Sequence, residues 1–315
     1  MKFILRTLCC VFAFSIFSLA PTRVAQAASL KDLTTAHLDT KLLKASQVPE
    51  RCSSAREFIT TFEYLQRHPG LALTREQMFD VASQVAKGCS GAARRFVKVF
   101  EVLSKSGSGT HDAIKIAVEL ANRPQAYSDT FVLVFTRSYL TKYLNLDYRT
   151  SLILANALAT NYTGDPRIAA KDFVKLVKFC DSSKGMNYSK PLCGIIAARV
   201  VKRAENFDAL IAGQFIKLYR FLTSSKGPAA PIAKALKIAD NVVAQGPEAA
   251  DNFITAYNYA ITNGGLGLPA VQSVAFAENI SKDTFYNLKP GIFRKSIASR
   301  LPASIVQLNL APAKN

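Results

Sequence analysis

Large apolar residues recur along this chain with a helical spacing and at nearly regular intervals. A Phe followed by Ile or Val occurs six times, and the successive Phe residues are 38, 35, 42, 42 and 38 residues apart. The six dipeptides are Phe58-Ile59, Phe96-Val97, Phe131-Val132, Phe173-Val174, Phe215-Ile216 and Phe253-Ile254. Four positions after each Phe stands another large apolar residue: Phe62, Phe100, Phe135, Val177, Tyr219 and Tyr257. Apolar residues at i, i+1 and i+4 share one side of an α-helix, so each dipeptide predicts a helix that buries one face.

A second pattern, apolar-Ala-x-x-apolar, recurs in step with the first. Its alanines are Ala82, Ala117, Ala155, Ala197, Ala239 and Ala277. Each Ala follows the Phe of its frame by 24 residues, except in the second frame, where the offset is 21. The repeating unit is therefore two helices and a loop, and we name them the A helix, with the Phe, and the B helix, with the Ala. Phe supplies bulk and Ala lets a neighbouring backbone come close, which is a complementary pair for packing.

One such helix pair cannot bury its own apolar faces, whereas six pairs stacked in a row can. The sequence therefore predicts an all-α fold, an α-solenoid of about six two-helix repeats with N- and C-terminal helical caps. The period and the two-helix plan resemble the HEAT and armadillo class of helical repeats over about residues 50–282. The alternative is a non-repeating helical globule with ordinary core phenylalanines. We favour the solenoid because two patterns keep register over six frames.

Two local signals predict where particular helices begin. Thr74 followed by Gln77 is typical of a capping box, which starts the first B helix. Asp165-Pro166 supplies an N-cap and a first-turn proline for the fourth A helix. The fourth and fifth frames also share a Ser-Ser-Lys-Gly turn, at 182–185 and 224–227, which predicts two loops of one design.

The ends of the chain predict three further segments around the repeats of 51–282. Residues 1–27 are typical of a secretory signal peptide, with a basic start, an apolar run and a small-x-small cleavage site that ends at Ala27. Residues 28–50 are polar and predict an N-terminal cap. Residues 283–315 contain five basic residues and, after Asp283, no acidic one, which predicts a basic C-terminal cap and tail. We therefore expect a periplasmic or secreted protein.

Basic residues exceed acidic ones by a wide margin. The formal net charge is +18, and removal of residues 1–27 leaves 37 basic and 22 acidic residues, or +15. Such an excess favours contact with an anionic partner. Stacked repeats would align the cations that stand two or five positions after a pattern Phe, and we name this set the basic ridge: Lys98, Lys175, Lys178, Lys217 and Arg220. The alternative is a solvated outer face without a specific ligand.

Four cysteines follow the predicted signal peptide, and an even number in an exported chain predicts disulfides. Cys180 ends the fourth A helix and Cys193 begins the fourth B helix, so these two meet across one loop. Cys52 and Cys89 precede the first and second A helices and form the second predicted bond. A metal site made from all four is the alternative, but the spacing contains no Cys-x-x-Cys pair and export disfavours it.

Motifs for catalysis or for cofactor binding are not found. The three histidines, His37, His68 and His111, are far apart, and no phosphate-binding glycine loop or nucleophile motif occurs. Glu63 and Glu101 stand five positions after their Phe in adjacent frames, and as a carboxylate pair they are candidates for glycan cleavage. A solvated face is the alternative for them. Three tyrosines near the third turn, Tyr139, Tyr143 and Tyr148, are candidates either for packing or for stacking on a ligand.

Together these features predict a binding or scaffolding protein that mediates protein–protein interaction in the cell envelope, without a cofactor or a metal ion. One alternative is a basic surface that binds an anionic polymer or membrane, such as lipopolysaccharide, a cell-wall polymer or phospholipid. Nucleic acid is disfavoured as a partner. A third, weaker alternative is an envelope enzyme that acts on glycans.

Overall fold

Twelve α-helices make up most of the residues that the structure describes. The computed structural model describes residues 54–283 except 142, 161, 205, 208 and 209, together with 293, 295 and 296. All of these belong to one unit, Ala45–Asn315. The predicted signal peptide, the predicted N-terminal cap and most of the predicted C-terminal cap lie outside the described residues.

The helices match the two sequence patterns one to one. The A helices are α2 (Ala55–Gln66), α4 (Ala92–Lys105), α6 (Gln125–Phe135), α8 (Pro166–Asp181), α10 (Ala212–Thr223) and α12 (Ala249–Ile261). The B helices are α3 (Arg75–Ala86), α5 (Thr110–Ala121), α7 (Tyr148–Ala159), α9 (Lys190–Arg203), α11 (Ile232–Val243) and α13 (Ala270–Ile280). A short 3₁₀ helix, η2 (Pro69–Leu71), follows α2, and a π-helical segment, η3 (Thr136–Leu140), continues α6.

The predicted helix starts are also present. Thr74 and Gln77 form a reciprocal capping box at the start of α3, in which each side chain accepts a hydrogen bond from the other residue's backbone N–H. Asp165 caps α8 by accepting from the Arg167 N–H at 2.7 Å, and Pro166 is the first residue of that helix. These signals succeed because they depend on residues three or fewer positions apart.

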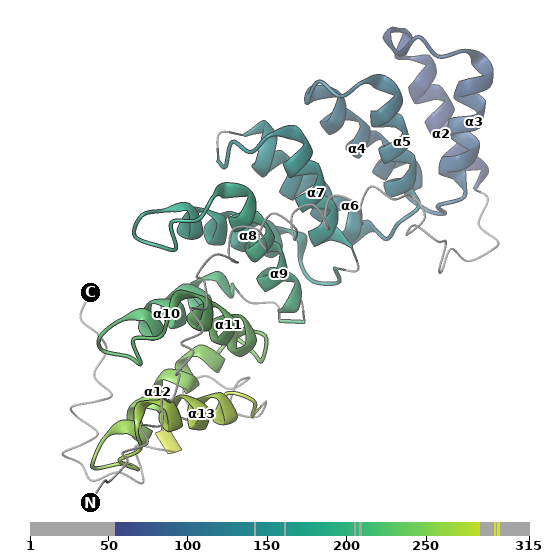
Figure 1. Cartoon of the computed structure of the whole chain (residues 1–315). Helices are drawn as coiled ribbons and strands as arrows, with labels where there is room; N and C mark the ends of the chain where they lie inside the picture. Colours follow the sequence, from purple (N-terminus) through teal and green to yellow (C-terminus); the bar gives the residue numbers. More distant parts are fainter. Residues whose placement is uncertain are drawn as a thin grey trace, which may run out of the picture. The chain divides into compact units, whose positions relative to one another are not determined.

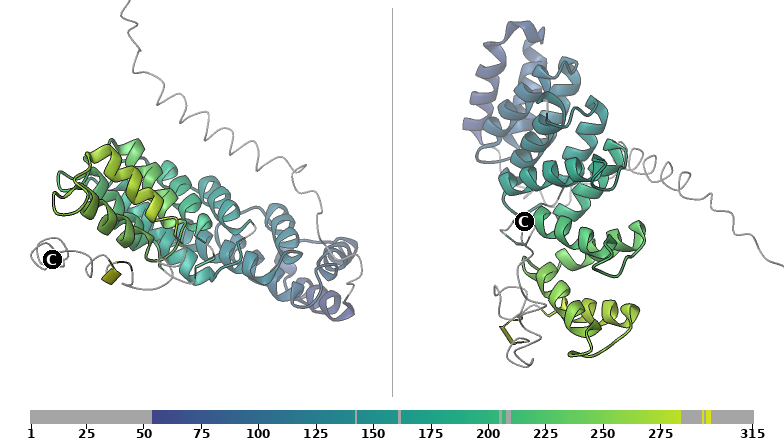
Figure 2. Two further views of the ribbon diagram at one scale, coloured as in Figure 1. Left: turned by 90° about the horizontal axis from the view of Figure 1, so that it is seen from below. Right: turned by 90° about the vertical axis from the view of Figure 1, so that its left-hand side faces the viewer.

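Each A helix packs against the B helix that follows it and against the A helix of the next pair (Figure 1). Contacts between A helices link α2 to α4, α4 to α6, α6 to α8, α8 to α10, and α10 to α12. Among the B helices, α3 packs against α5 and α7 against α9. The views of Figure 2 show the same succession of pairs in chain order. The all-α prediction is confirmed, with helices packed mostly as sequential neighbours.

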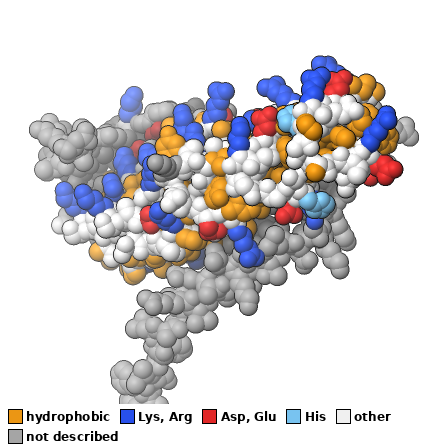
Figure 3. All heavy atoms as spheres, turned by 90° about the horizontal axis from the view of Figure 1, so that it is seen from above, with side chains coloured by type: hydrophobic (Ala, Val, Ile, Leu, Met, Phe, Trp, Pro, Cys, Tyr) orange, Lys and Arg blue, Asp and Glu red, His pale blue; other side chains and the backbone are white. Residues whose placement is uncertain are grey.

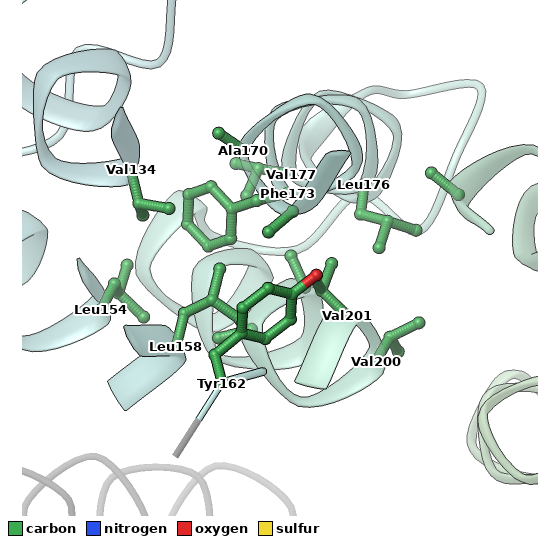
Figure 4. Close-up of a cluster of buried hydrophobic side chains, with 14 of the residues drawn as sticks. Val134, Leu154, Leu158, Tyr162, Ala170, Phe173, Leu176, Val177, Val200 and Val201 are labelled. Atoms are coloured by element: carbon green, nitrogen blue, oxygen red, sulfur yellow. The ribbon is translucent and has the colours of Figure 1, made fainter. Parts of the chain in front are cut away.

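The residues that define the two patterns lie in the core. The side chains of Phe96, Phe131, Phe173, Phe215 and Phe253 are at most 1% exposed, and all six pattern alanines are 0% exposed. Figure 4 shows the Phe173 ring among buried side chains of other helices, such as Val134 of α6 and Leu158 of α7. Phe58, in the first pair, is only half-buried. Removal of apolar surface from water thus explains why these residue types recur.

Among the described residues, each loop between an A helix and its B helix contains one with a left-handed backbone. These residues are Ala72, Gly107, Asn145, Asn187, Ala229 and Gly267, with φ between 48° and 80°. Each stands ten residues before the pattern Ala of its B helix, including in the short second loop. The six loops therefore enter their B helices in the same way. Gly adopts this conformation freely and Asn tolerates it, whereas Ala adopts it at a cost in free energy.

The turns after α8, α10 and α12 share a second feature. A Cβ atom on Gly185, Gly227 or Gly265 would lie 1.7, 2.1 or 1.8 Å from a backbone carbonyl oxygen six residues earlier. The N–H of each glycine donates to the carbonyl oxygen three residues before it. The sequence predicted this likeness for the fourth and fifth turns only. The sixth turn has Thr262-Asn263-Gly264-Gly265 instead of Ser-Ser-Lys-Gly and still adopts the same backbone.

A disulfide bond joins α8 to α9, as predicted. It connects Cys180 to Cys193, whose Cα atoms are 5.4 Å apart, and both residues are buried. Cys52 lies outside the described residues, so the Cys52–Cys89 bond stays a prediction.

We expect that Ala229→Gly stabilises the protein by about 1 kcal/mol, because glycine removes the cost of a left-handed alanine. Urea denaturation followed by circular dichroism measures this change. Ala230→Gly is the matched control, since Ala230 is the next residue and does not have a positive φ. The control should be neutral or destabilising, and equal effects of both changes would contradict the explanation.

Candidate functional site

The five residues of the basic ridge lie on three A helices, and all five are exposed. Lys98 is on α4, Lys175 and Lys178 are on α8, and Lys217 and Arg220 are on α10. Figure 3 shows Lys and Arg side chains spread along one face of the molecule, with hydrophobic and acidic side chains between them. The contacts of the ridge residues differ, however, and these differences decide what each can offer a ligand.

Two ridge lysines form ion pairs with the next A helix. Lys98 Nζ lies 2.5 Å from Asp129 Oδ1 of α6, and Lys217 pairs in the same way with Asp251 of α12. Both aspartates stand two positions before the pattern Phe of their helix. Partial burial alone would raise the pKa of Asp129, but hydrogen bonds from Lys98 and Gln125 lower it, and the net shift is downward. The charge of each of these lysines is therefore partly satisfied within the protein.

Lys175 occupies the equivalent position in the fourth pair, but it faces a glycine. The residue two positions before Phe215 is Gly213, and a Cβ atom added there would lie 3.4 Å from Lys175 Nζ. Within the described part of the chain, no acidic side chain lies within ion-pair distance of Lys175. The α8–α10 junction thus retains the lysine of this recurring pair without the aspartate.

The two other ridge cations lie over aromatic rings. Lys178 Nζ is 5.2 Å from the centre of the Tyr143 ring, and the guanidinium carbon of Arg220 is 5.3 Å from the centre of the Phe179 ring. Tyr143 itself is 58% exposed. Such cation–π contacts hold a long side chain in place while its charge stays accessible. We name these residues, Tyr143, Lys175, Lys178 and Arg220, the α8–α10 patch.

The other two tyrosines of the third turn serve packing. The rings of Tyr139 and Tyr148 each lie 5.7 Å from the ring of Phe135. Their hydroxyl groups make hydrogen bonds to the preceding loop, Tyr139 to the Ser106 carbonyl oxygen and Tyr148 to the Ser108 side chain. Of the three candidates, Tyr143 is thus the one that presents its ring to solvent.

The candidate carboxylate pair has no enclosing site. Glu63 and Glu101 are both exposed, and Glu63 forms an ion pair with Arg67 one turn later on the same chain, at 3.1 Å.

A groove of about 350 Å³ lies between α3 and α5. Its polar side chains include Asp80, His111 and Lys115, and all three are exposed to solvent. Across the described residues, no group of three or more His, Cys, Asp or Glu side chains could hold a metal ion. None of the described helices combines the length and the apolar character that a membrane span requires.

The structure also reveals a polar position at the junctions between pairs. The residue immediately before each pattern Phe is polar: Glu57, Arg95, Thr130, Asp172, Gln214 and Asn252. Five of the six are buried, and Gln214 is half-buried. Sequence reasoning missed this position, although a polar residue beside the Phe in all six frames was a visible signal.

Two of these residues bind the start of the next A helix. Glu57 on α2 accepts hydrogen bonds from the backbone N–H groups of Gly91 (3.1 Å) and Ala93 (2.7 Å), at the start of α4. Asp172 on α8 accepts one from the Ile211 N–H at 2.7 Å, at the start of α10. A carboxylate there satisfies amide groups that have no partner within the helix and complements the positive end of its dipole.

Arg95 and Asp240 connect other helices. Arg95 on α4 donates to the carbonyl oxygens of Gly88 (2.8 Å), Ser90 (3.1 Å) and Ala121 (2.9 Å). Asp240 on α11 is nearly buried and pairs with Arg199 (3.0 Å) and Arg203 (2.9 Å) of α9. Buried polar contacts of this kind fix how one pair lies on the next. In any other arrangement a buried polar group would lack its hydrogen-bond partner, which would destabilise the fold.

Asp172 has an unusual electrostatic environment. Burial raises its pKa to about 6, although hydrogen bonds from the backbone of Ile211 and Ala212 and the charge of Lys175 all oppose the shift. Its second oxygen, Oδ1, is buried and has no hydrogen-bond partner among the described residues. The ionised form is therefore less favourable in the folded protein than in the unfolded chain.

Comparisons with known proteins found no matching family model, no matching curated protein and no matching solved structure.

We expect the stability contributed by Asp172 to fall as pH rises. Its pKa is about 6 in the folded protein against an ordinary value of 3.8, so below pH 3.8 the carboxyl group is neutral in both states. Between that pH and about 6 the unfolded chain ionises first, which favours unfolding by up to about 3 kcal/mol. The free energies of unfolding of the natural protein and of Asp172→Asn, measured in urea across this range, should therefore diverge. A difference that stays constant with pH would contradict the assignment.

Proposed function

We propose that this protein is an exported α-solenoid that binds a protein partner in the cell envelope and acts as a scaffold there. The contacts between successive A helices support the solenoid, since each pair covers the apolar face of the one before it. The equivalent left-handed loop residues and buried pattern residues support one repeated unit. The resemblance to HEAT and armadillo repeats belongs to this proposal.

Export is supported by the signal-like residues 1–27 and by the Cys180–Cys193 disulfide. Disulfides form and persist in oxidising compartments such as the periplasm and the extracellular space. The proposed location is therefore periplasmic or extracellular.

The observation that carries the binding proposal is the α8–α10 patch. Three exposed cations and an exposed aromatic ring lie together on and beside two packed helices. None of the three cations has an acidic side chain within ion-pair distance among the residues described. Arg and Tyr are enriched in protein interfaces because they combine apolar area with hydrogen bonding.

A second candidate function is attachment to an anionic polymer or membrane surface. The net charge favours it, since it is +18 for the whole chain and +15 without residues 1–27, and so does the same patch. Binding of that kind weakens steeply with salt, because dissolved ions screen the attraction. This salt dependence separates it from recognition by a protein partner.

To test the proposal, the disulfide-intact protein is used to capture partners from the envelope of its source organism, alongside Lys175→Glu/Lys178→Glu. We expect this variant to capture at least tenfold less of the partner, since the charges of both patch lysines on α8 are reversed. Quantitative mass spectrometry of the captured proteins measures the loss.

The matched control is Lys234→Glu/Lys237→Glu. These lysines have the same i, i+3 spacing, are exposed and lie on the B helix α11. Capture by the control should equal that of the natural protein. Equal capture by all three proteins, or none above background, would overturn the proposal. Salt-sensitive binding to anionic vesicles without any captured protein would favour the second candidate.

A further inference from the structure

The junction between α8 and α10 lacks one half of an ion pair that two other junctions possess. Where an A helix has Lys two positions after its Phe and the next A helix has Asp two positions before its own, the two side chains pair. At α8–α10 the lysine is Lys175, and Gly213 stands where the aspartate would be. The cation of the pair is present, and the carboxylate that would bind it is missing.

We propose that this site binds a carboxylate side chain of an acidic peptide segment in the partner protein. The inference rests on the proposed function and names the chemistry that its partner presents. The carboxylate would occupy the position that Asp129 and Asp251 occupy at the two complete junctions. We name Lys175 and Gly213 the open junction.

The geometry at Gly213 fits such an occupant. Outside its own helix and its chain neighbours, the one described heavy atom within 4 Å of a Cβ placed on Gly213 is Lys175 Nζ, at 3.4 Å. The Lys175 ammonium group thus lies directly beside the Gly213 backbone, where a complete junction would have the aspartate side chain. Gly213 lies in the first turn of α10, and the amide group before that turn, of Ile211, already donates to Asp172.

The rest of the α8–α10 patch extends the site. Lys178 lies one turn after Lys175 on α8, and Arg220 of α10 lies over a ring of α8. A peptide with several acidic residues would reach these cations in turn, and Tyr143 offers an exposed ring beside them. We favour a carboxylate over a phosphate because both complete junctions use a single lysine with an aspartate. Phosphate is more often bound by bidentate arginine or by several backbone amides.

The test measures binding of a fluorescein-labelled oligoglutamate peptide to the full-length mature protein by fluorescence anisotropy. Gly213→Asp supplies the missing aspartate from within the chain, so we expect it to weaken binding about tenfold. Lys175→Ala should weaken it to a similar extent. Gly213→Asn is the matched control, since it has the size of aspartate without the charge, and its dissociation constant should stay within about twofold of the natural value.

A gain-of-binding variant tests the same idea in the opposite direction. Asp251→Gly reproduces at α10–α12 the arrangement found at α8–α10 and leaves Lys217 without its partner. Its affinity for the peptide should increase. Unchanged or weaker binding by this variant would contradict the role assigned to the open junction.

Three further results would overturn the inference. The natural protein would not bind the peptide, or Gly213→Asp and Gly213→Asn would lose equal affinity for it, or the natural protein would bind anionic phospholipid vesicles but not the peptide. Partner capture separates this inference from the proposed function. If Gly213→Asp captures the partner normally while Lys175→Glu/Lys178→Glu does not, the open junction is wrong and the scaffold function stands. If no partner is captured but the variants change peptide binding as expected, the open junction stands and the scaffold function is wrong.

Discussion

The fold depends on each helix pair burying the apolar face of its neighbour. A pair of helices of 11 to 16 residues cannot enclose a core alone, because one side of each amphipathic helix would stay in water. The pattern Phe of one A helix and the pattern Ala of a B helix solve this together, since a bulky ring fills the space and a methyl group permits close approach. Contacts between adjacent pairs are therefore needed to complete the core.

Apolar burial alone does not determine how one pair is placed on the next. The polar residue before each pattern Phe supplies that information at several junctions. Glu57 and Asp172 bind the amide groups at the start of the following A helix. Arg95 binds carbonyl oxygens of the loop before α4 and of the last residue of α5. Hydrogen bonds are directional, so each of these contacts selects one arrangement among the many that would bury similar area. The high pKa of Asp172 shows that such a contact carries a cost in desolvation.

Polar contacts between successive A helices also occur on the surface, and these connect the fold to the proposed function. Where lysine and aspartate meet across a junction, as in Lys98–Asp129, the charge is used within the protein. Where Gly213 stands in place of the aspartate, no acidic side chain of the described residues lies within ion-pair distance of Lys175. The recurring sequence pattern makes this comparison possible, because Lys98, Lys175 and Lys217 stand at the same position relative to their pattern Phe and a departure in the facing residue stands out.

The sequence by itself determined the secondary structure, the helix pairs, the buried pattern residues and the Cys180–Cys193 bond. These follow from local spacing, since a 3.6-residue period places residues on a face whatever lies opposite. Only the tertiary structure decided which of the aligned lysines are neutralised, that Tyr143 alone of the three turn tyrosines is exposed, and that Asp172 caps α10. Those outcomes join residues more than 30 positions apart, and whether such residues meet depends on the angle and axial shift between packed helices, which no local pattern encodes.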